Sequence, residues 1–269
     1  MRLLITGASG FLGSAVVQSC SLRFREKIEI LLWDQVAHGS LLSQESRDAY
    51  LEANKPDTVL HLAWQSTIDL HYESSPTHHD WANATLDFAA ECIHRNIWFI
   101  CAGSAIDERR DGSTTHLDLS NYVESKRHLK ERFTAMAKSK SKMTWLQIQY
   151  VFSMSELRPR LLRAVMTSKD PRTFHPDNPD SFHDFIHVDD VATAISTVIS
   201  NSITGEIAVG TGFTISTKDF VEIVKFHGGF QQTRPKITRK RTAVHRNILL
   251  SLNWSPLISL EFLGIQTTA

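Results

Sequence analysis

Runs of consecutive apolar residues alternate along the chain with segments in which apolar residues recur every three or four positions. The runs predict strands, and the periodic segments predict helices. Strands that are apolar on both faces are typical of a parallel sheet covered by helices on both sides, and the alternation is that of βαβ units. The pattern predicts an α/β fold with strands at 2–6, 28–33, 58–64, 97–103 and 143–152 and helices at 10–22, 47–54, 81–95 and 121–138.

The texture of the chain changes after about residue 153. Proline and histidine become frequent over 169–185, and a helical pattern follows over 188–200. We therefore expect a large domain over 1–152 and a smaller region over 153–269, with the segment at about 184–200 returning to the large domain.

The composition narrows the class of protein without identifying it. The 29 Lys and Arg residues balance 29 Asp and Glu, so no net basic charge points to nucleic acid. The three cysteines are odd in number and unrelated in spacing, which argues against a disulfide framework or a metal cluster. No apolar run approaches the length of a membrane span, and no secretory signal is recognisable. We expect a cytoplasmic protein with no metal, no membrane partner and no nucleic-acid partner.

Three glycines follow the first predicted strand at intervals of three, in "ITGASGFLG": Gly7, Gly10 and Gly13. A glycine-rich turn that leads from a strand into a helix presents unpaired backbone N–H groups, and such groups bind phosphate. Gly7 would permit the tight turn, Gly10 the approach of a pyrophosphate, and Gly13 the close packing of the helix. The spacing differs from the usual G-x-G-x-x-G, but its place directly after a strand predicts a dinucleotide site.

The second predicted strand runs into Asp34. An acidic residue at that strand end accepts hydrogen bonds from the adenosine ribose in dinucleotide-binding folds. It would also repel a 2′-phosphate, which favours NAD and leaves NADP as the alternative. The competing interpretation is an ordinary surface aspartate.

A tyrosine and a lysine stand four residues apart in "NYVESK", at Tyr122 and Lys126. On a helix they share a face, and a nearby ammonium favours the phenolate, which makes the phenol a better proton donor and acceptor. Ser104 ends the predicted strand "IWFICAGS", at the sheet edge where α/β proteins bind ligands. Each feature alone also fits a surface pair or a turn, but together they predict a proton-transfer site.

These segments resemble the extended short-chain dehydrogenase/reductase family, which comprises sugar-nucleotide epimerases, dehydratases and reductases. The opening "ITGASGFLGSAVV" resembles the strand, turn and helix of that family, and "KPDTVLHLAW" resembles a later strand. Similar segments continue through "DFIHVDDVATAI", "GEIAVGTGFTISTKDFVEIV" and "LNWSPLISLEFL". The resemblance extends from residue 2 to about residue 263. It implies a Rossmann-like, doubly wound parallel sheet with a small C-terminal substrate-binding region.

The resemblance also implies roles for individual residues. Tyr122 would be the general acid/base, Lys126 would bind the nicotinamide ribose, and Ser104 would position the substrate oxygen. The cofactor would be NAD, with NADP possible. The residues expected to contact it, besides Tyr122 and Lys126, are Gly7, Gly10, Phe11, Leu12, Gly13, Asp34, Leu62 and Ala63.

The chain departs from the family pattern on the adenine and substrate sides. Leu41 and Leu42 stand in place of an Asp-Leu pair that meets adenine. Trp64 replaces a small residue, Tyr150 replaces a frequent asparagine, and His183 replaces a frequent arginine. We expect Trp64, Ser104, Tyr150 and His183 to contact the substrate, with a changed grip on it.

The function implied is NAD(P)-dependent reduction of a keto group on a nucleotide-linked deoxysugar. Epimerisation at the 4-position of the sugar is the first alternative. Dehydration is another, because Asp107 and Glu108 follow Ser104 closely and the dehydratases use an acidic pair. A regulator that binds the cofactor without catalysis is a third. A homodimer is expected by analogy with the family.

Overall fold

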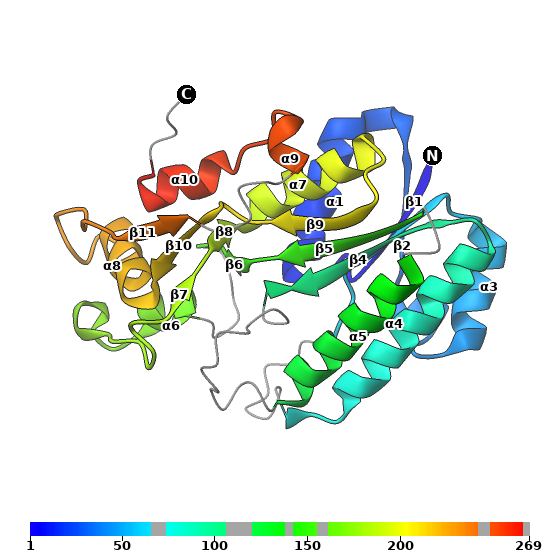
Figure 1. Ribbon diagram of the computed structural model, residues 1–269, viewed down its shortest axis with the longest axis horizontal. Helices are drawn as coiled ribbons and strands as arrows, with labels where there is room; N and C mark the ends of the chain where they lie inside the picture. The colour runs from blue at the N-terminus through cyan, green and yellow to red at the C-terminus, as the bar shows by residue number, and fades with distance from the viewer. Residues whose placement is uncertain (66–73, 106–119, 138–141, 155–160, 242–247, 266–269) are drawn as a thin grey trace. The chain divides into compact units, whose positions relative to one another are not determined.

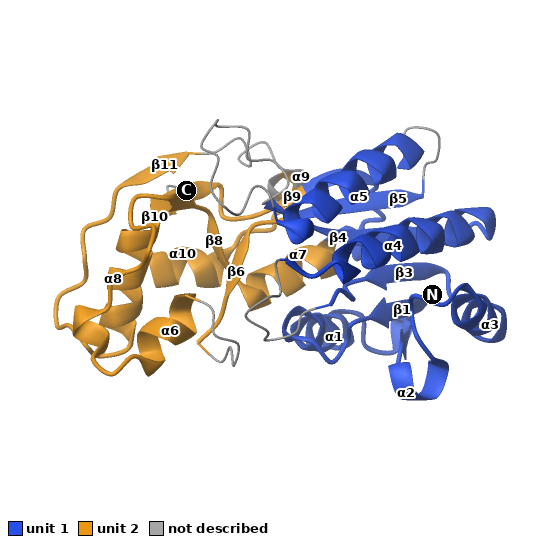
Figure 2. Ribbon diagram, turned by 90° about the horizontal axis from the view of Figure 1, so that it is seen from below, with its two compact units in different colours: residues 1–147, 198–207 blue, residues 148–197, 208–269 orange. Residues whose placement is uncertain are grey.

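The computed structural model describes residues 1–269 except 66–73, 106–119, 138–141, 155–160, 242–247 and 266–269 (Figure 1). The chain divides into two compact units, shown in different colours in Figure 2. The first comprises Met1–Gln147 and Val198–Ile207, and the second comprises Ile148–Thr197 and Ala208–Ala269. The segment that returns to the first unit is thus 198–207, further along the chain than the expected 184–200.

A six-stranded sheet in the order β2-β1-β3-β4-β5-β9 forms the centre of the first unit. The pairs β1–β2, β1–β3 and β3–β4 are parallel, as the alternation of apolar runs and helical segments predicts. The strands are β1 (Arg2–Thr6), β2 (Glu29–Leu32), β3 (Thr58–His61), β4 (Trp98–Ser104), β5 (Met143–Ile148) and β9 (Gly205–Val209).

Helices cover both faces of this sheet, with α4 and α5 side by side on one face and α1 on the other (Figures 1 and 2). This is why the inner strands are apolar on both sides: Leu3, Leu4 and Ile5 of β1 are fully buried, as are Val59 and Leu60 of β3. The helical segments are α1 (Phe11–Phe24), η1 (Arg25–Lys27), α2 (Gln35–His38), α3 (Gln44–Asn54), α4 (Thr77–His94), α5 (Asn121–Ala137) and α7 (Val188–Ser200), whose last turn belongs to this unit.

The continuous strand expected over 143–152 is wrong. The chain forms two strands there, β5 and β6 (Tyr150–Phe152), and they belong to different sheets. The hydrogen-bond partner changes at Gln149: its N–H donates to the carbonyl of Val209, whereas the next N–H, that of Tyr150, donates to the carbonyl of Asp184. An apolar sequence with no turn residue gives no signal for such a change of partner.

The second unit contains two small sheets, one of three strands in the order β11-β10-β7 and one of the parallel pair β6–β8. Its core packs three phenylalanines among aliphatic side chains: Phe185 and Phe220 stack with centroids 3.8 Å apart, and Phe152 packs edge-on against Phe220. Its remaining elements are α6 (Leu161–Thr167), η5 (Pro171–Thr173), β7 (Phe182–His183), β8 (Phe185–His187), β10 (Phe213–Ser216), α8 (Thr217–His227), β11 (Arg239–Arg241), α9 (Ile248–Ser251) and α10 (Leu257–Leu263).

Within the described residues, no helix is long and apolar enough to cross a membrane.

Candidate active site

The glycine-rich turn lies between β1 and α1. Gly7 has φ +70°, a conformation that favours glycine, and a Cβ there would lie 2.8 Å from the backbone nitrogen of Ala63. A Cβ on Gly13 would lie 2.0 Å from the carbonyl oxygen of Gly7, inside the turn itself. A Cβ on Gly10 would meet only the Gly7 oxygen, at 3.2 Å. The chain's own packing therefore requires glycine at positions 7 and 13, whereas at Gly10 the lack of a side chain suits the approach of a ligand.

The start of α1 suits an anion. Its N-cap residue, Gly10, has no side chain with which to accept hydrogen bonds from the first turn, and no acidic residue lies in that turn. The first N–H groups of a helix carry partial positive charge and have no partner within the helix. The turn therefore fits the pyrophosphate of a dinucleotide, with Gly10, Phe11, Leu12 and Gly13 as the residues that would hold it.

A buried chain of hydrogen bonds fixes the loop against which Gly7 packs. His61 Nε2 lies 3.1 Å from the hydroxyl of Thr85, which itself donates to the carbonyl of Trp81. His61 Nε2 is therefore the donor and Nδ1 the acceptor, so that the Thr6 hydroxyl, 2.9 Å away, donates to Nδ1 and accepts from the N–H of Ala63. Burial, with Lys126 and Arg47 nearby, lowers the pKa of His61 to about 3, which keeps the ring neutral. Each hydrogen bond in the series therefore keeps the donor and acceptor given above.

Asp34 lies directly after β2 and caps the short helix α2. Its Oδ1 accepts hydrogen bonds from the N–H groups of Val36 and Ala37, each at 2.9 Å. Within the described residues, Oδ1 of this exposed carboxylate accepts both of these hydrogen bonds and Oδ2 accepts none. The carboxylate is therefore held in a fixed orientation with one oxygen suited to a ribose hydroxyl. The helix α2 was not predicted, because four residues carry no periodic pattern.

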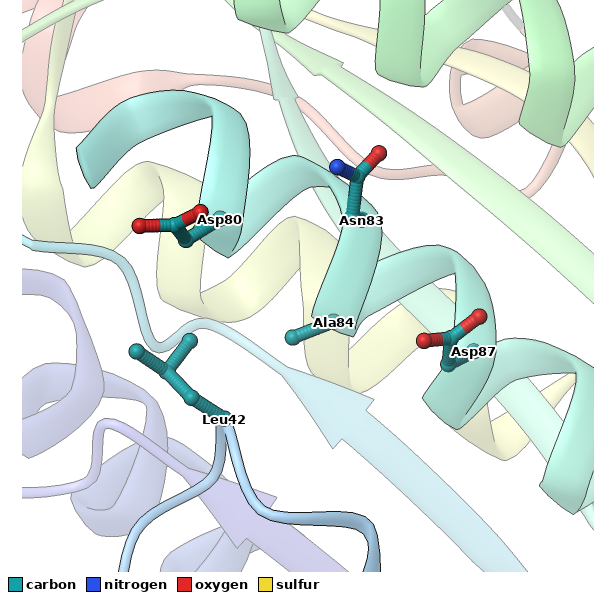
Figure 3. Close-up of a pocket in the computed structure, with 5 residues that line it drawn as sticks. All are labelled: Leu42, Asp80, Asn83, Ala84 and Asp87. Atoms are coloured by element: carbon teal, nitrogen blue, oxygen red, sulfur yellow. The ribbon is translucent and has the colours of Figure 1, made fainter. Parts of the chain in front are cut away.

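Leu41 and Leu42 differ in environment. Leu41 is buried in the core, and its carbonyl accepts a hydrogen bond from Arg47. Arg47 is 1% exposed and forms a bidentate ion pair with Glu91. Leu42 is exposed and lines a pocket of about 330 Å³. The other lining residues lie along α4 opposite Leu42: Asp80, Asn83, Ala84 and Asp87 (Figure 3).

Ser104 ends β4, as predicted, at the same edge of the sheet as the glycine-rich turn. The backbone of the preceding residue, Gly103, packs against the indole of Trp145, and a Cβ on Gly103 would lie 2.3 Å from carbons of that ring. This contact holds the strand end that carries Ser104. Asp107 and Glu108 lie outside the described residues.

Tyr122 and Lys126 lie one helical turn apart on α5, as their spacing predicts. The Lys126 ammonium lies 6.0 Å from the Tyr122 ring centroid and 3.4 Å from that of Trp64. Lys126 is only 5% exposed. The indole N–H of Trp64 donates to Nδ1 of the buried His78 at 3.1 Å. The first unit thus brings a phenol, an ammonium and two further aromatic rings together.

Tyr150 and His183 lie in the second unit and contact each other, with ring centroids 4.2 Å apart. His183 also lies 3.0 Å from the hydroxyl of Ser181 through Nε2. The next residue, Asp184, is buried and accepts hydrogen bonds from Thr211 and Gly212. Tyr150 and His183 therefore form one aromatic surface, while their neighbour fixes a turn.

Sequence reasoning did not identify four buried polar residues that support these sites: Arg47, His61, His78 and Asp184. A charged or imidazole side chain inside an otherwise apolar segment was the available signal for His61, which stands within "TVLHLAW". In the described part of the chain, no group of three or more His, Cys, Asp or Glu side chains could hold a metal ion.

The chain matches one family of known proteins over most of its length. A model of the NAD dependent epimerase/dehydratase family matches residues 3–210. A search of curated protein sequences gave no match.

Solved structures with a similar fold represent three reaction types. A UDP-glucose 4-epimerase from Thermus thermophilus, in complex with NAD, is 20% identical, with 95% of this chain and 94% of that chain covered and a TM-score of 0.72. A dTDP-glucose 4,6-dehydratase from Bacillus anthracis, also with NAD, is 16% identical, with 98% and 94% covered and a TM-score of 0.72. A dTDP-4-dehydrorhamnose reductase from Bacillus anthracis, with NADP, is 16% identical, with 99% and 98% covered and a TM-score of 0.71. At these identities the likeness establishes the fold, which is the α/β, Rossmann-like arrangement that the sequence predicts.

Proposed function

Because the chain belongs to the NAD dependent epimerase/dehydratase family, we propose that it reduces a keto group on a nucleotide-linked deoxysugar with NADH or NADPH. The observation that carries the proposal is the pair on α5: a phenol with a nearly buried ammonium one turn away, in the unit that contains the glycine-rich turn. An ammonium in that place stabilises the phenolate that remains when the phenol gives up its proton.

The reduced nicotinamide, when bound, supplies the hydride for the carbonyl carbon. The chain's own part is to deliver a proton to the carbonyl oxygen as negative charge develops on that oxygen, and Tyr122 is the proton donor. Ser104 donates a hydrogen bond to the same oxygen, which lowers the cost of the developing negative charge. Lys126 stabilises the phenolate, which later takes a proton from solvent.

The residues proposed to hold the cofactor are assigned to successive parts of an extended dinucleotide. Gly7, Gly10, Phe11, Leu12 and Gly13 would hold the pyrophosphate, Asp34 the adenosine ribose, and Leu62 and Ala63 the nicotinamide side. Lys126 and Tyr122 would meet the nicotinamide ribose. For adenine, Leu42 and Ala84 offer apolar surface, and Asp80 and Asp87 can accept from an exocyclic amino group.

On the substrate side we propose Trp64, Ser104, Tyr150 and His183. Tyr150 and His183 present two rings in tilted contact, which can pack against the face of a sugar or base but offer less charge than an arginine would. We therefore propose a nucleotide sugar as the substrate and a recognition that depends more on stacking than on ion pairs.

The test is to incubate the protein with NADH or NADPH and a panel of 4-keto-6-deoxy nucleotide sugars and to follow the absorbance of the reduced nicotinamide. Net oxidation of the cofactor with formation of the hydroxy sugar is the expected result. Interconversion of sugars without net oxidation would replace reduction by epimerisation, and loss of water from a 6-hydroxy sugar would replace it by dehydration. Cofactor binding with no turnover of any sugar would favour the non-catalytic regulator.

The matched variant is Tyr122→Phe, which removes one hydroxyl and keeps the ring. Removal of a general acid lowers the rate by about 10²–10⁴-fold, and we expect the affinity for the cofactor to change little. A variant that kept most of the wild-type rate would exclude Tyr122 as the proton donor.

We also propose that the protein is a homodimer with α5 in the interface, by analogy with the family. Sedimentation equilibrium measures this directly. A monomer at micromolar concentration would contradict the proposal without affecting the assignment of the site.

A further inference from the structure

Two aromatic rings lie near the Lys126 ammonium. The ammonium lies 3.4 Å from the centroid of the Trp64 ring, well within the range of a cation–π contact, and 6.0 Å from that of Tyr122. With Lys126 only 5% exposed, little water solvates the charge. Burial disfavours the charged form of an ammonium, and the face of the indole supplies part of the stabilisation that compensates for the lost water.

The indole is itself fixed by a buried histidine. The Trp64 N–H donates to Nδ1 of His78 at 3.1 Å, and the two rings are nearly parallel, with an interplanar angle of 12°. His78 is 0% exposed and also packs edge-on against the Tyr122 ring, with centroids 5.2 Å apart. Because Nδ1 accepts this hydrogen bond, it carries no hydrogen itself, so His78 is neutral in this arrangement and places no second positive charge beside Lys126.

We propose that Trp64 and His78 are positioning residues for Lys126: His78 fixes the plane of the indole, and the indole holds the ammonium beside Tyr122. The inference rests on the proposed function, in which Lys126 acts on Tyr122. It assigns to Trp64 a role that is separate from contact with the substrate. It also assigns a role to His78, which is not among the residues proposed to bind the cofactor or the substrate.

The experiment measures ionisation of the Tyr122 phenol in the protein alone, by ultraviolet absorbance during an alkaline titration. The chain has 4 tyrosines, and subtraction of the Tyr122→Phe spectrum isolates the signal of Tyr122. The variants are Trp64→Leu, which removes the aromatic face, Trp64→Phe, which keeps a weaker one, and Lys126→Met, which gives the full effect of losing the ammonium. His61 lies near Lys126, but its pKa of about 3 keeps it neutral throughout.

We expect the midpoint of Tyr122 to rise by about 1 pH unit in Trp64→Leu, because an ammonium that moves away from the phenol stabilises the phenolate less. Trp64→Phe should give a smaller rise, and Lys126→Met the largest. The midpoint reports the Tyr–Lys pair rather than either group alone. For His78, we expect His78→Leu to raise the midpoint and His78→Asn, which keeps an acceptor near the position of Nδ1, to restore it.

The control for a merely structural loss is Trp98→Leu, at the start of β4. Trp98 is also a buried, hydrogen-bonded indole of the first unit, with its N–H on Thr144. We expect Trp98→Leu to lower thermal stability without moving the Tyr122 midpoint. If Trp64→Leu does not fold, Trp64→Phe and His78→Leu decide the question.

The outcomes separate this inference from the function on which it rests. A midpoint that moves in Lys126→Met but stays at the wild-type value in the Trp64 and His78 variants would overturn the positioning role and leave the Tyr–Lys pair intact. A midpoint that does not move in Lys126→Met would overturn the proposed function first. A rise in Trp98→Leu equal to that in Trp64→Leu would also overturn the positioning role.

Discussion

Two buried side chains that hold loops in the first unit are an arginine and a neutral imidazole, whereas two buried side chains that bind backbone N–H groups in the second unit are carboxylates. Arg47 holds the carbonyl of Leu41 while paired with Glu91, and His61 holds the loop after β3 through Thr6. In the second unit, Asp184 accepts from the backbone of Thr211 and Gly212, and Asp190 accepts from the backbone of Ile258 and Ser259.

The difference has an electrostatic consequence. Burial lowers the pKa of His61 to about 3 and raises that of Asp184 to about 6, because in both cases burial disfavours the charged form. The pKa of Asp190 is raised for the same reason. His61 in the first unit therefore stays neutral in mild acid, whereas Asp184 in the second unit binds a proton as the pH falls below about 6.

The two regions also differ in the changes expected relative to the family pattern. The loops held by Arg47 and His61 border the proposed cofactor path, where the glycine-rich turn tolerates little change. Asp184, which holds the turn at 211–212, follows directly on His183, which contacts Tyr150, and these two aromatic residues are expected in place of polar ones.

The largest expected effect comes from removing the cation of the first unit. Arg47→Met leaves the mostly buried Glu91, whose side chain is 12% exposed, without its partner and frees the carbonyl of Leu41, and we expect the free energy of unfolding to fall by about 3 kcal/mol. Chemical denaturation measures it. The control is Arg95→Met, which removes a partly exposed ion pair with Asp48 and should cost less than about 1 kcal/mol.

A double variant, Arg47→Met with Glu91→Leu, sharpens the comparison. It removes both charges and should recover part of the loss, since no buried charge is left unpaired. If the single and double variants were equally unstable, the hydrogen bond to Leu41 rather than the charge of Glu91 would be the main contribution of Arg47.

The next effect concerns the turn that the first unit supports. Gly13→Ala places a Cβ 2.0 Å from the Gly7 oxygen, and we expect it to lower the free energy of unfolding by about 3 kcal/mol. Gly10→Ala is the matched variant: its Cβ meets that oxygen at 3.2 Å, and its φ of −76° is ordinary. Gly10→Ala should remain nearly as stable as the wild type but lose affinity for NADH, measured by fluorescence titration. Unchanged affinity in Gly10→Ala would place the pyrophosphate elsewhere.

The glycine-rich turn illustrates what the sequence could predict. Strand, turn and helix are contiguous there, so the apolar run, the three glycines and the helical period suffice to place them. The Tyr–Lys pair was predictable for the same reason, because one helical turn sets their geometry. The alternation of strands and helices then predicted a parallel sheet covered on both faces.

Contacts between distant residues were not predictable in the same way. His61 has the pattern of a buried strand residue, and its partners Thr6 and Thr85 stand far away in the sequence. The strands β7 and β10 of the second unit are two and four residues long and pair across about thirty positions. Segments so short carry no period of their own, and only the folded chain shows their partners.

A smaller effect is expected from the carboxylate of the second unit. Asp184→Asn keeps the shape of the side chain but sets an amide NH₂ against an N–H donor of the 211–212 turn. We expect a loss of about 2 kcal/mol in the free energy of unfolding at pH 7. Asp189→Asn, at an exposed position nearby, is the control and should change stability by less than about 0.5 kcal/mol. Equal stability of the two variants would show that the turn does not depend on the buried carboxylate.

The smallest effect is a change in how steeply the free energy of unfolding depends on pH, and it tests the electrostatic difference between the two units. His61 has a folded pKa of about 3 against an ordinary 6.5, so the unfolded chain binds more protons and its contribution to stability is lost as the pH falls from 6.5 towards 3. Asp184 has a folded pKa of about 6 against 3.8, so the folded chain binds more protons and its contribution is present at low pH and lost as the pH rises through 6.

Between about pH 4 and 6 the two contributions therefore oppose each other in the wild type. Asp184→Asn removes one of them, so its free energy of unfolding should fall relative to that of the wild type by about 1 kcal/mol for each pH unit of acidification. Other titrating groups are common to both proteins and cancel in the difference. Urea denaturation of both proteins at several pH values measures that difference. Parallel pH curves for the two proteins would mean that Asp184 stays ionised in the folded chain, and the electrostatic contrast between the two units would then be wrong.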